Sequence, residues 1–133
     1  QLGRRFRALK LWFVLRYYGL KGLQQKLREH IAMAGELKEW IDQHGDFELL
    51  APLTLNVLCF RYNPGNIGSD DTLNELNERL LHEINRTGEI YMSHTKLSGK
   101  YTLRLVIAQT DVEKSHVLRA WELIQQKVEE LTS

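Results

Sequence analysis

The sequence has one cysteine, Cys59, and only two prolines among its 133 residues. A single cysteine excludes a disulfide bond within the chain and is typical of a protein from a reducing compartment. Because Cys59 lies in an apolar run, we predict a buried and unreactive thiol. The charges nearly cancel, at a formal net charge of +1, and give no general reason to expect nucleic acid or a membrane as a partner.

The sequence also lacks the residue patterns of most self-contained active sites. It offers no Ser–His–Asp set, no cysteine and histidine spacing of a metal site, and no glycine-rich phosphate loop. We therefore expect neither a catalytic residue nor a metal ligand in this chain. The histidines are scattered, and we predict structural or exposed roles for all five: His30, His44, His82, His94 and His116.

The most unusual stretch is the apolar run at residues 9–18, which follows the arginines Arg4, Arg5 and Arg7. At helical periodicity this run puts large apolar side chains on every face, which is typical of a buried helix. It is too short to span a bilayer, which takes about 20 apolar residues. We favour a subunit or domain interface, with an ordinary core helix or a helix on a membrane surface as alternatives.

The remaining sequence predicts an alternation of helices and strands. Residues 20–41 carry apolar side chains at steps of three and four, which indicates an amphipathic helix after a break at Gly19 and Gly22, ended by Gly45. Residues 73–84 and 117–131 repeat this pattern, and capping boxes place their starts at Thr72 and Thr110. Alternating apolar residues predict four strands, at residues 47–51, 53–62, 90–95 and 101–108.

This order describes an α+β protein, in which a βαββα core follows two helices. We expect a small antiparallel or mixed sheet with its helices on one face. Residues 1–45 would form an N-terminal helical segment, and residues 46–133 the α+β domain. Within the last strand, Arg104 points away from its apolar neighbours, so it lies either on a solvated face or toward an anionic partner. On its residues alone, the chain is predicted to be an interaction or accessory domain.

Five stretches resemble one enzyme family. These stretches are LGRRFRALKLWFVLRYYG at 2–19, KGLQQKLREHIAMA at 21–34, LCFRYNP at 58–64, LRLVIAQT at 103–110 and HVLRAW at 116–121. Together they are similar to the C-terminal part of group II pyridoxal-phosphate-dependent amino-acid decarboxylases, above all the aromatic-L-amino-acid branch. The resemblance covers nearly the whole chain, and its first stretch is the most specific.

The resemblance implies the small domain of a fold type I enzyme, a cytoplasmic homodimer of amino-acid metabolism. Its reaction would convert an aromatic L-amino acid to the amine and CO₂, with pyridoxal phosphate as electron sink. In that family a lysine in a His-Lys motif holds the cofactor, and none of the eight lysines here has that context. We therefore expect no cofactor-binding residue, no bound pyridoxal phosphate and no activity from this chain alone.

The resemblance also implies two places near the substrate. Gly3 and Arg4 match a turn that approaches the pocket of the neighbouring subunit. Arg104 resembles an arginine that meets a substrate carboxylate in related glutamate decarboxylases; its other possible role is to tie the small domain to the large one. The implied partners are the enzyme's own large domain, a second subunit and an amino-acid substrate, without nucleic acid or membrane. The alternative is a stand-alone α+β interaction or regulatory module that docks through its apolar N-terminal helix.

Overall fold

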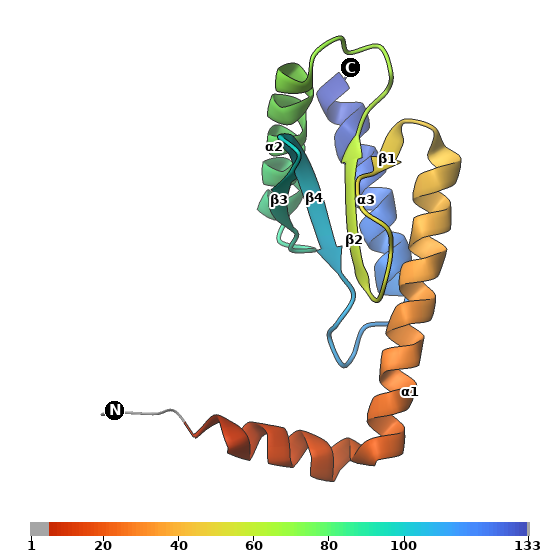
Figure 1. The fold of residues 1–133 in the computed structure, drawn as a ribbon, viewed down its shortest axis with the longest axis vertical. Coiled ribbons are helices and arrows are strands. Elements are labelled where there is room, and N and C mark those ends of the chain that lie inside the picture. Colours follow the sequence, from red (N-terminus) through yellow and green to blue (C-terminus); the bar gives the residue numbers. More distant parts are fainter. Residues whose placement is uncertain (1–5, 133) are drawn as a thin grey trace.

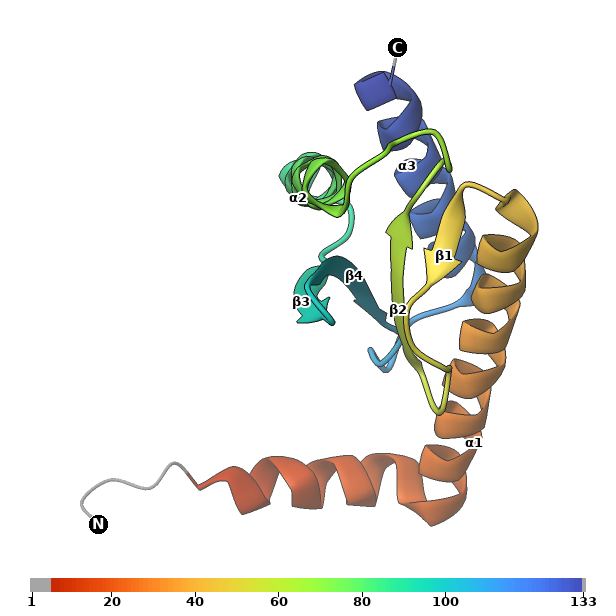
Figure 2. The same ribbon diagram turned by 45° about the horizontal axis from the view of Figure 1, so that its top comes forward.

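The computed structural model describes residues 6–132, which form an α+β fold. Its elements in chain order are α1 (Arg7–His44), β1 (Phe47–Leu49), β2 (Val57–Tyr62), α2 (Asp70–Arg86), β3 (Ser93–Leu97), β4 (Lys100–Val106) and α3 (Lys114–Thr132). The strands form one antiparallel sheet in the order β1-β2-β4-β3, and the helices pack on one of its faces (Figures 1 and 2). The expected fold class, a βαββα core after two helical segments, is therefore confirmed.

The two predicted N-terminal helices are the two halves of α1, which bends at Gly19. Gly19 has φ 65° and ψ 175°, a conformation that only glycine adopts without strain. Beyond the bend the second half packs on the sheet, and it ends at His44 before Gly45, whose φ of 82° makes the predicted left-handed cap. The first half, residues 7–18, projects from the body of the molecule (Figures 1 and 2). We call residues 7–18 the arm.

The arm keeps its large side chains in water, although it is apolar on all sides. Leu11, Trp12, Phe13 and Tyr17 are each more than half exposed. In the described part of the chain, no helix is long and apolar enough to cross a membrane. The arm is therefore not an ordinary core helix of this domain, which was one of the alternatives considered from the sequence.

The core lies between one sheet face and the three helices. Leu58 and Phe60 of β2 and Leu103 of β4 are fully buried or nearly so, and they face residues of all three helices. The ring of Trp121 in α3 lies 5.0 Å from that of Phe47 in β1, which ties the last helix to the first strand. The predicted apolar stripe of the last helix is thus confirmed.

The strand β2 is shorter than predicted. It begins at Val57, and before it the side chain of Asn56 donates to the carbonyl oxygen of Ile107 at 2.7 Å. Val57 is exposed and Cys59 only half-buried, because the face of β2 that carries them has no helix on it. The predicted buried thiol at Cys59 is therefore wrong.

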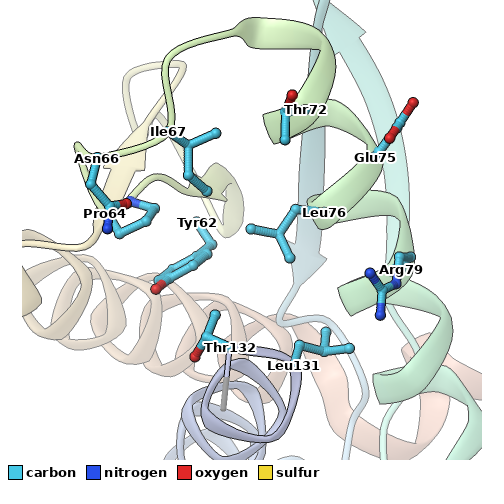
Figure 3. A pocket seen from close by; sticks show the side chains of 10 residues that line it. All are labelled: Tyr62, Pro64, Asn66, Ile67, Thr72, Glu75, Leu76, Arg79, Leu131 and Thr132. Carbon is cyan, nitrogen blue, oxygen red and sulfur yellow. The ribbon is translucent and has the colours of Figure 1, made fainter.

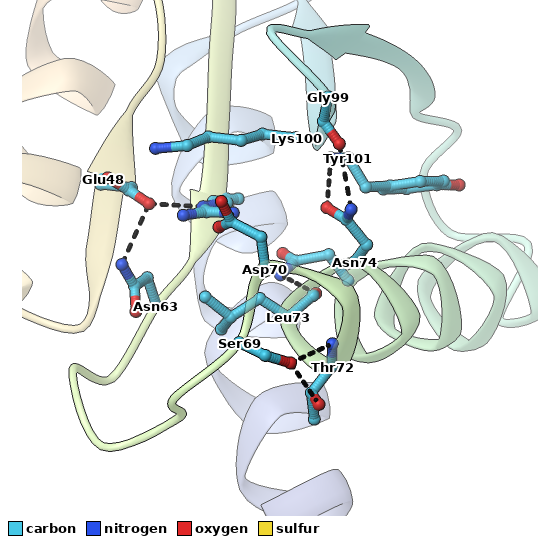
Figure 4. Close-up of polar contacts among 12 residues, drawn as sticks. Glu48, Asn63, Ser69, Asp70, Thr72, Leu73, Asn74, Gly99, Lys100 and Tyr101 are labelled. Carbon is cyan, nitrogen blue, oxygen red and sulfur yellow. Dashed lines mark hydrogen bonds and ion pairs between the residues drawn. The ribbon is translucent and has the colours of Figure 1, made fainter.

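Both predicted capping boxes are wrong as well. The helix α2 begins at Asp70, and the hydroxyl of Ser69 accepts a hydrogen bond from the backbone N–H of Thr72 at 3.1 Å (Figure 4). Ser69 takes the capping role three residues earlier than expected, since it offers the same oxygen sooner in the chain. The helix α3 begins at Lys114, so Thr110 lies in the turn before it.

The hairpin between β3 and β4 lies where the sequence predicts it, although β3 itself begins three residues later than expected. Its two turn residues, Ser98 and Gly99, have φ values of 52° and 83°. Two consecutive residues with positive φ match the twist of the flanking strands and fix their register, which pairs Leu97 with Lys100.

Three asparagines of α2 hold the helix to backbone groups outside it. Each side chain accepts from one N–H and donates to a carbonyl oxygen of the same short segment, as a peptide group would. The side chain of Asn77 accepts from the backbone N–H of Tyr62 at 2.8 Å and donates to its carbonyl oxygen at 2.9 Å. Asn85 makes the same two bonds to the backbone of Met92 at the same distances. Asn74 bonds the N–H of Tyr101 at 2.6 Å and the carbonyl of Gly99 at 3.0 Å (Figure 4).

We predict that Asn77→Ala destabilises the protein by about 2–4 kcal/mol. The side chain of Asn77 is fully buried, so the substitution would leave both backbone groups of Tyr62 without a partner in the interior. Urea unfolding followed by circular dichroism measures the loss. Asn66→Ala, in an exposed loop, is the control and should change the free energy of unfolding by less than about 0.5 kcal/mol. Equal effects of the two substitutions would contradict the role of Asn77.

Candidate functional site

The sheet face opposite the helices is the first candidate surface. It carries the outward-pointing residues of the two central strands and of the edge strand β3. Val57 and Val106 are Cα partners at one end of it, both at least one-third exposed. We call this surface the open face and define it by Val57, Cys59, Ser93, Arg104 and Val106.

Arg104 lies at the centre of the open face. Its Cα partners on the two neighbouring strands are Cys59 and Ser93, and its Nε donates to the hydroxyl of Ser93 at 2.9 Å. The adjacent residues Leu103 and Leu105 point into the core, so the alternation of β4 directs Arg104 outward. Its side chain is exposed, and no carboxylate of the described residues forms an ion pair with it. An unpaired guanidinium on a rigid strand is suited to bind a carboxylate or phosphate of a partner.

A second arginine, Arg61 in β2, is buried and has partners from two elements. Its Nε donates to a carboxylate oxygen of Glu48 in β1, and one of its terminal nitrogens donates to Asp70 in α2 at 2.8 Å. Glu48 also accepts from the side chain of Asn63 at 3.0 Å (Figure 4). Arg61 thereby joins the edge strand to the start of α2, which is a structural role.

These contacts shift the titration of both charged groups. Burial alone would raise the pKa of Glu48, but the hydrogen bonds from Arg61 and Asn63 and the positive charge of Arg61 lower it. Burial likewise works against the charged form of Arg61, whereas Glu48 and Asp70 raise the pKa of its guanidinium above the ordinary value.

The sequence analysis singled out Arg104 because it is a charged residue within a predicted strand. It missed Arg61, although Arg61 is likewise a charged residue within the predicted strand that contains Leu58–Tyr62.

The described surface also holds two hollows. One, of ≈ 400 Å³, lies between α2, the end of α3 and the loop before α2 (Figure 3). The other, of ≈ 690 Å³, lies where β4 leads toward α3 and includes Tyr91, Asp111 and His116 in its lining. No lysine lines either hollow, and no lysine is buried in the part of the chain that the structure describes. These residues therefore do not fit pyridoxal phosphate, which the resemblance implies for the whole enzyme. Residues 6–132 also contain no group of three potential metal ligands.

The predicted site residues are not brought together here. Gly3 and Arg4 lie outside the described residues, and Arg104 has only Ser93 and Cys59 beside it on the open face. The histidines have the structural or exposed positions expected of them: the ring of His94, for example, stacks on Tyr101 at 4.7 Å.

Comparison with known proteins gives one consistent family. The profile described as "Pyridoxal-dependent decarboxylase conserved domain" matches residues 1–63. Tryptophan decarboxylase TDC1 of Camptotheca acuminata is 46% identical over 125 residues, which are 93% of this chain and 25% of that protein. Phenylacetaldehyde synthase of Arabidopsis thaliana is 42% identical over 126 residues, 95% of this chain and 26% of that protein.

Solved structures agree with the sequence matches. The fold superposes on Oryza sativa TDC, crystallised with PLP and tryptamine, with a TM-score of 0.88 and 34% identity, covering 100% of this chain and 29% of that one. Catharanthus roseus tryptophan decarboxylase, in complex with L-tryptophan, gives a TM-score of 0.83 at 40% identity, and the match covers 97% of this chain and 26% of that one. The chain thus spans about a quarter of the length of the curated relatives.

We predict that the Glu48–Arg61 pair makes stability depend on pH in the acid range. Because its folded-state pKa is lowered, Glu48 contributes stability above its ordinary pKa, and this contribution is lost as the pH falls through the lowered value. At pH ~7, Glu48→Gln should lower the free energy of unfolding by about 1–3 kcal/mol, because the partner Arg61 stays buried. At a pH below the lowered pKa of Glu48, the difference from the parent protein should vanish.

Urea unfolding at several pH values tests this dependence, with the exposed Glu39→Gln as the control. A stability difference for Glu48→Gln that stayed constant from neutral to acid pH would contradict it.

Proposed function

We propose that the chain belongs to the family of pyridoxal-dependent decarboxylases and is the C-terminal part of an enzyme that decarboxylates an aromatic L-amino acid. The products would be the corresponding amine and CO₂. The observation that supports this most is the joint match of fold and sequence to tryptophan decarboxylase over nearly the whole chain. The identity covers 125 residues and therefore extends beyond residues 1–63, which the family profile matches, so it is not carried by that stretch alone.

The cofactor of such an enzyme would be held by residues outside this chain. When bound, pyridoxal phosphate supplies an electron sink for the charge left on the α-carbon after loss of CO₂. The described lysines do not fit that group, and the His-Lys motif implied by the resemblance is not in the sequence. We propose that the motif lies upstream in the whole enzyme. The contribution of this chain would then be to help position and enclose the active site.

Two surfaces are suited to that contribution. The open face exposes Val57 and Val106 around the unpaired guanidinium of Arg104, and the arm exposes aromatic side chains such as Trp12 and Phe13. Contiguous exposed apolar side chains of this kind mark an interface. We propose that residues 46–133 form a small domain whose open face docks on the large domain, and that the segment 1–45 packs against the large domain near a second subunit. The assembly would be a cytoplasmic homodimer.

The proposed residues near the substrate are Gly3, Arg4 and Arg104. A glycine at position 3 would let the backbone approach the pocket closely, since it has no side chain. Arg104 would face the cleft between the domains, where its exposed guanidinium meets either a substrate carboxylate or an acidic residue of the large domain.

A stand-alone docking module remains the second candidate, because the exposed arm is what such a module would use. The reading frame upstream of this sequence separates the two candidates. A His-Lys codon pair in frame supports the decarboxylase, and a start codon directly before this sequence supports the module.

We predict that the purified 133-residue chain forms neither amine nor aldehyde from aromatic amino acids and does not bind pyridoxal phosphate covalently. Incubation with the cofactor, reduction with borohydride and mass spectrometry test the second point. Product analysis with tryptophan, tyrosine and phenylalanine tests the first and includes the aldehyde, since one relative is an aldehyde synthase. A stoichiometric adduct at one lysine would contradict the prediction.

In the full-length enzyme we predict that Arg104→Ala lowers kcat/KM by about tenfold or more, whereas Arg5→Ala changes it by less than about threefold. The physical reason is the unpaired position of Arg104 on the open face. Steady-state kinetics of both variants measure the effect, and Arg104→Lys shows whether charge alone suffices. Equal kinetics of the two alanine variants would contradict the placement of Arg104 near the substrate.

A further inference from the structure

The charges of this chain are divided unevenly between its first 28 residues and the rest. The 28 residues before Glu29 hold eight of the 18 basic residues and none of the 17 acidic residues. Residues 29–133 therefore carry ten basic and seventeen acidic residues, a net charge of −7 against +8 for the first segment. A nearly neutral chain thus has a basic end and an acidic body, which attract each other between copies.

The basic residues of the arm do not share one face. Arg7 and Lys10 lie on one side of the helix, whereas Arg16 lies about half a turn away from Arg7, at 100° per residue. A helix lying in a membrane surface needs one apolar and one polar side. The guanidinium of Arg16 stands over the ring of Trp12, 5.8 Å from its centroid, so the two present an aromatic surface edged by a positive charge.

The acidic body offers a matching surface on α2. Asp71, Glu75 and Glu78 follow one another at steps of four and three, which places them on one side of the helix, and all three are exposed. None forms an ion pair with another described residue. Like charges at this spacing destabilise a helix unless a cation faces them. We call these three residues the acidic stripe.

An apolar hollow lies directly beside the acidic stripe. It is the cavity of ≈ 400 Å³ whose lining includes Tyr62, Ile67 and Leu131; the side chain of Leu76 points toward them, and that of Glu75 points outward from α2 at its edge (Figure 3). Glu75 and Arg79 both line the hollow, one carboxylate and one guanidinium, whereas Asp71 and Glu78 of the stripe do not line it. An apolar hollow that lies beside the three exposed carboxylates of α2 fits an aromatic side chain that has a basic neighbour.

We propose that, in the isolated chain, the arm of one copy binds α2 of a second copy, with Trp12 in the hollow and Arg16 against Glu75. Trp12 is 53% exposed, and its burial would remove apolar surface from water at the point where the charges pair. The occupant is a second copy because the same sequence supplies both the basic aromatic arm and the acidic stripe. This inference does not depend on the proposed enzymatic function.

Sedimentation velocity of the 133-residue chain over a range of concentrations tests the proposal. We expect self-association that weakens as salt rises from about 0.05 M to about 0.5 M, because the pairing charges are exposed to screening. Association through apolar contacts alone would keep its strength or grow in salt. A monomer at every concentration, or association strengthened by salt, would overturn the proposal.

Charge reversal identifies the contact. Arg16→Glu and Glu75→Arg should each weaken association by about tenfold or more, and the two together should restore it to within about threefold of the parent chain. Glu39→Arg, a reversal at an exposed position of α1 outside the stripe, is the matched control and should leave association within about threefold of the parent. Circular dichroism confirms that each variant is folded. Failure of the double reversal to restore association would overturn the pairing of Arg16 with Glu75.

Discussion

The fold depends on how α2 satisfies backbone groups that the small sheet leaves unpaired. A buried N–H or carbonyl without a partner costs as much free energy as a lost hydrogen bond. Asn74, Asn77 and Asn85 supply one acceptor and one donor each, to the segments at Tyr101, Tyr62 and Met92. These contacts fix α2 along the sheet, and Arg61 adds a further tie from β2 to Asp70 at its start. The position of α2 in turn decides which sheet face is covered.

The one-sided packing explains why the candidate surfaces lie where they do. Strand alternation sends Leu103 and Leu105 into the core, so Arg104 between them must point to the other face. That face has no helix on it in the described structure, and it keeps two exposed valines. A layer that covers only one face of a sheet leaves the second for another layer, which supports the proposal that the large domain docks there.

The sequence predicted those features that local chemistry decides. Gly19 and Gly45 fix the bend and the end of α1 through positive φ, and the apolar stripe of α3 follows from helical periodicity alone. The start of α2 was missed because Ser69 and Thr72 offer the same capping oxygen, and only the path of the loop decides between them. A charge within a strand marks Arg61 in the sequence, but the partners of Asn77 and Arg61 lie fifteen and thirteen residues away, and no local pattern identifies them. Gly3 and Arg4, predicted near the substrate, stay predictions.

The arm has two proposed partners, and their relation follows from concentration. In the whole enzyme the large domain would be tethered to the arm by the same chain, at an effective concentration of the order of millimolar. A second copy at micromolar concentration competes with that tethered surface at a disadvantage of about a thousandfold, even for equal contacts. The acidic stripe would therefore bind the arm only where the tethered surface is missing, as it is for the isolated chain.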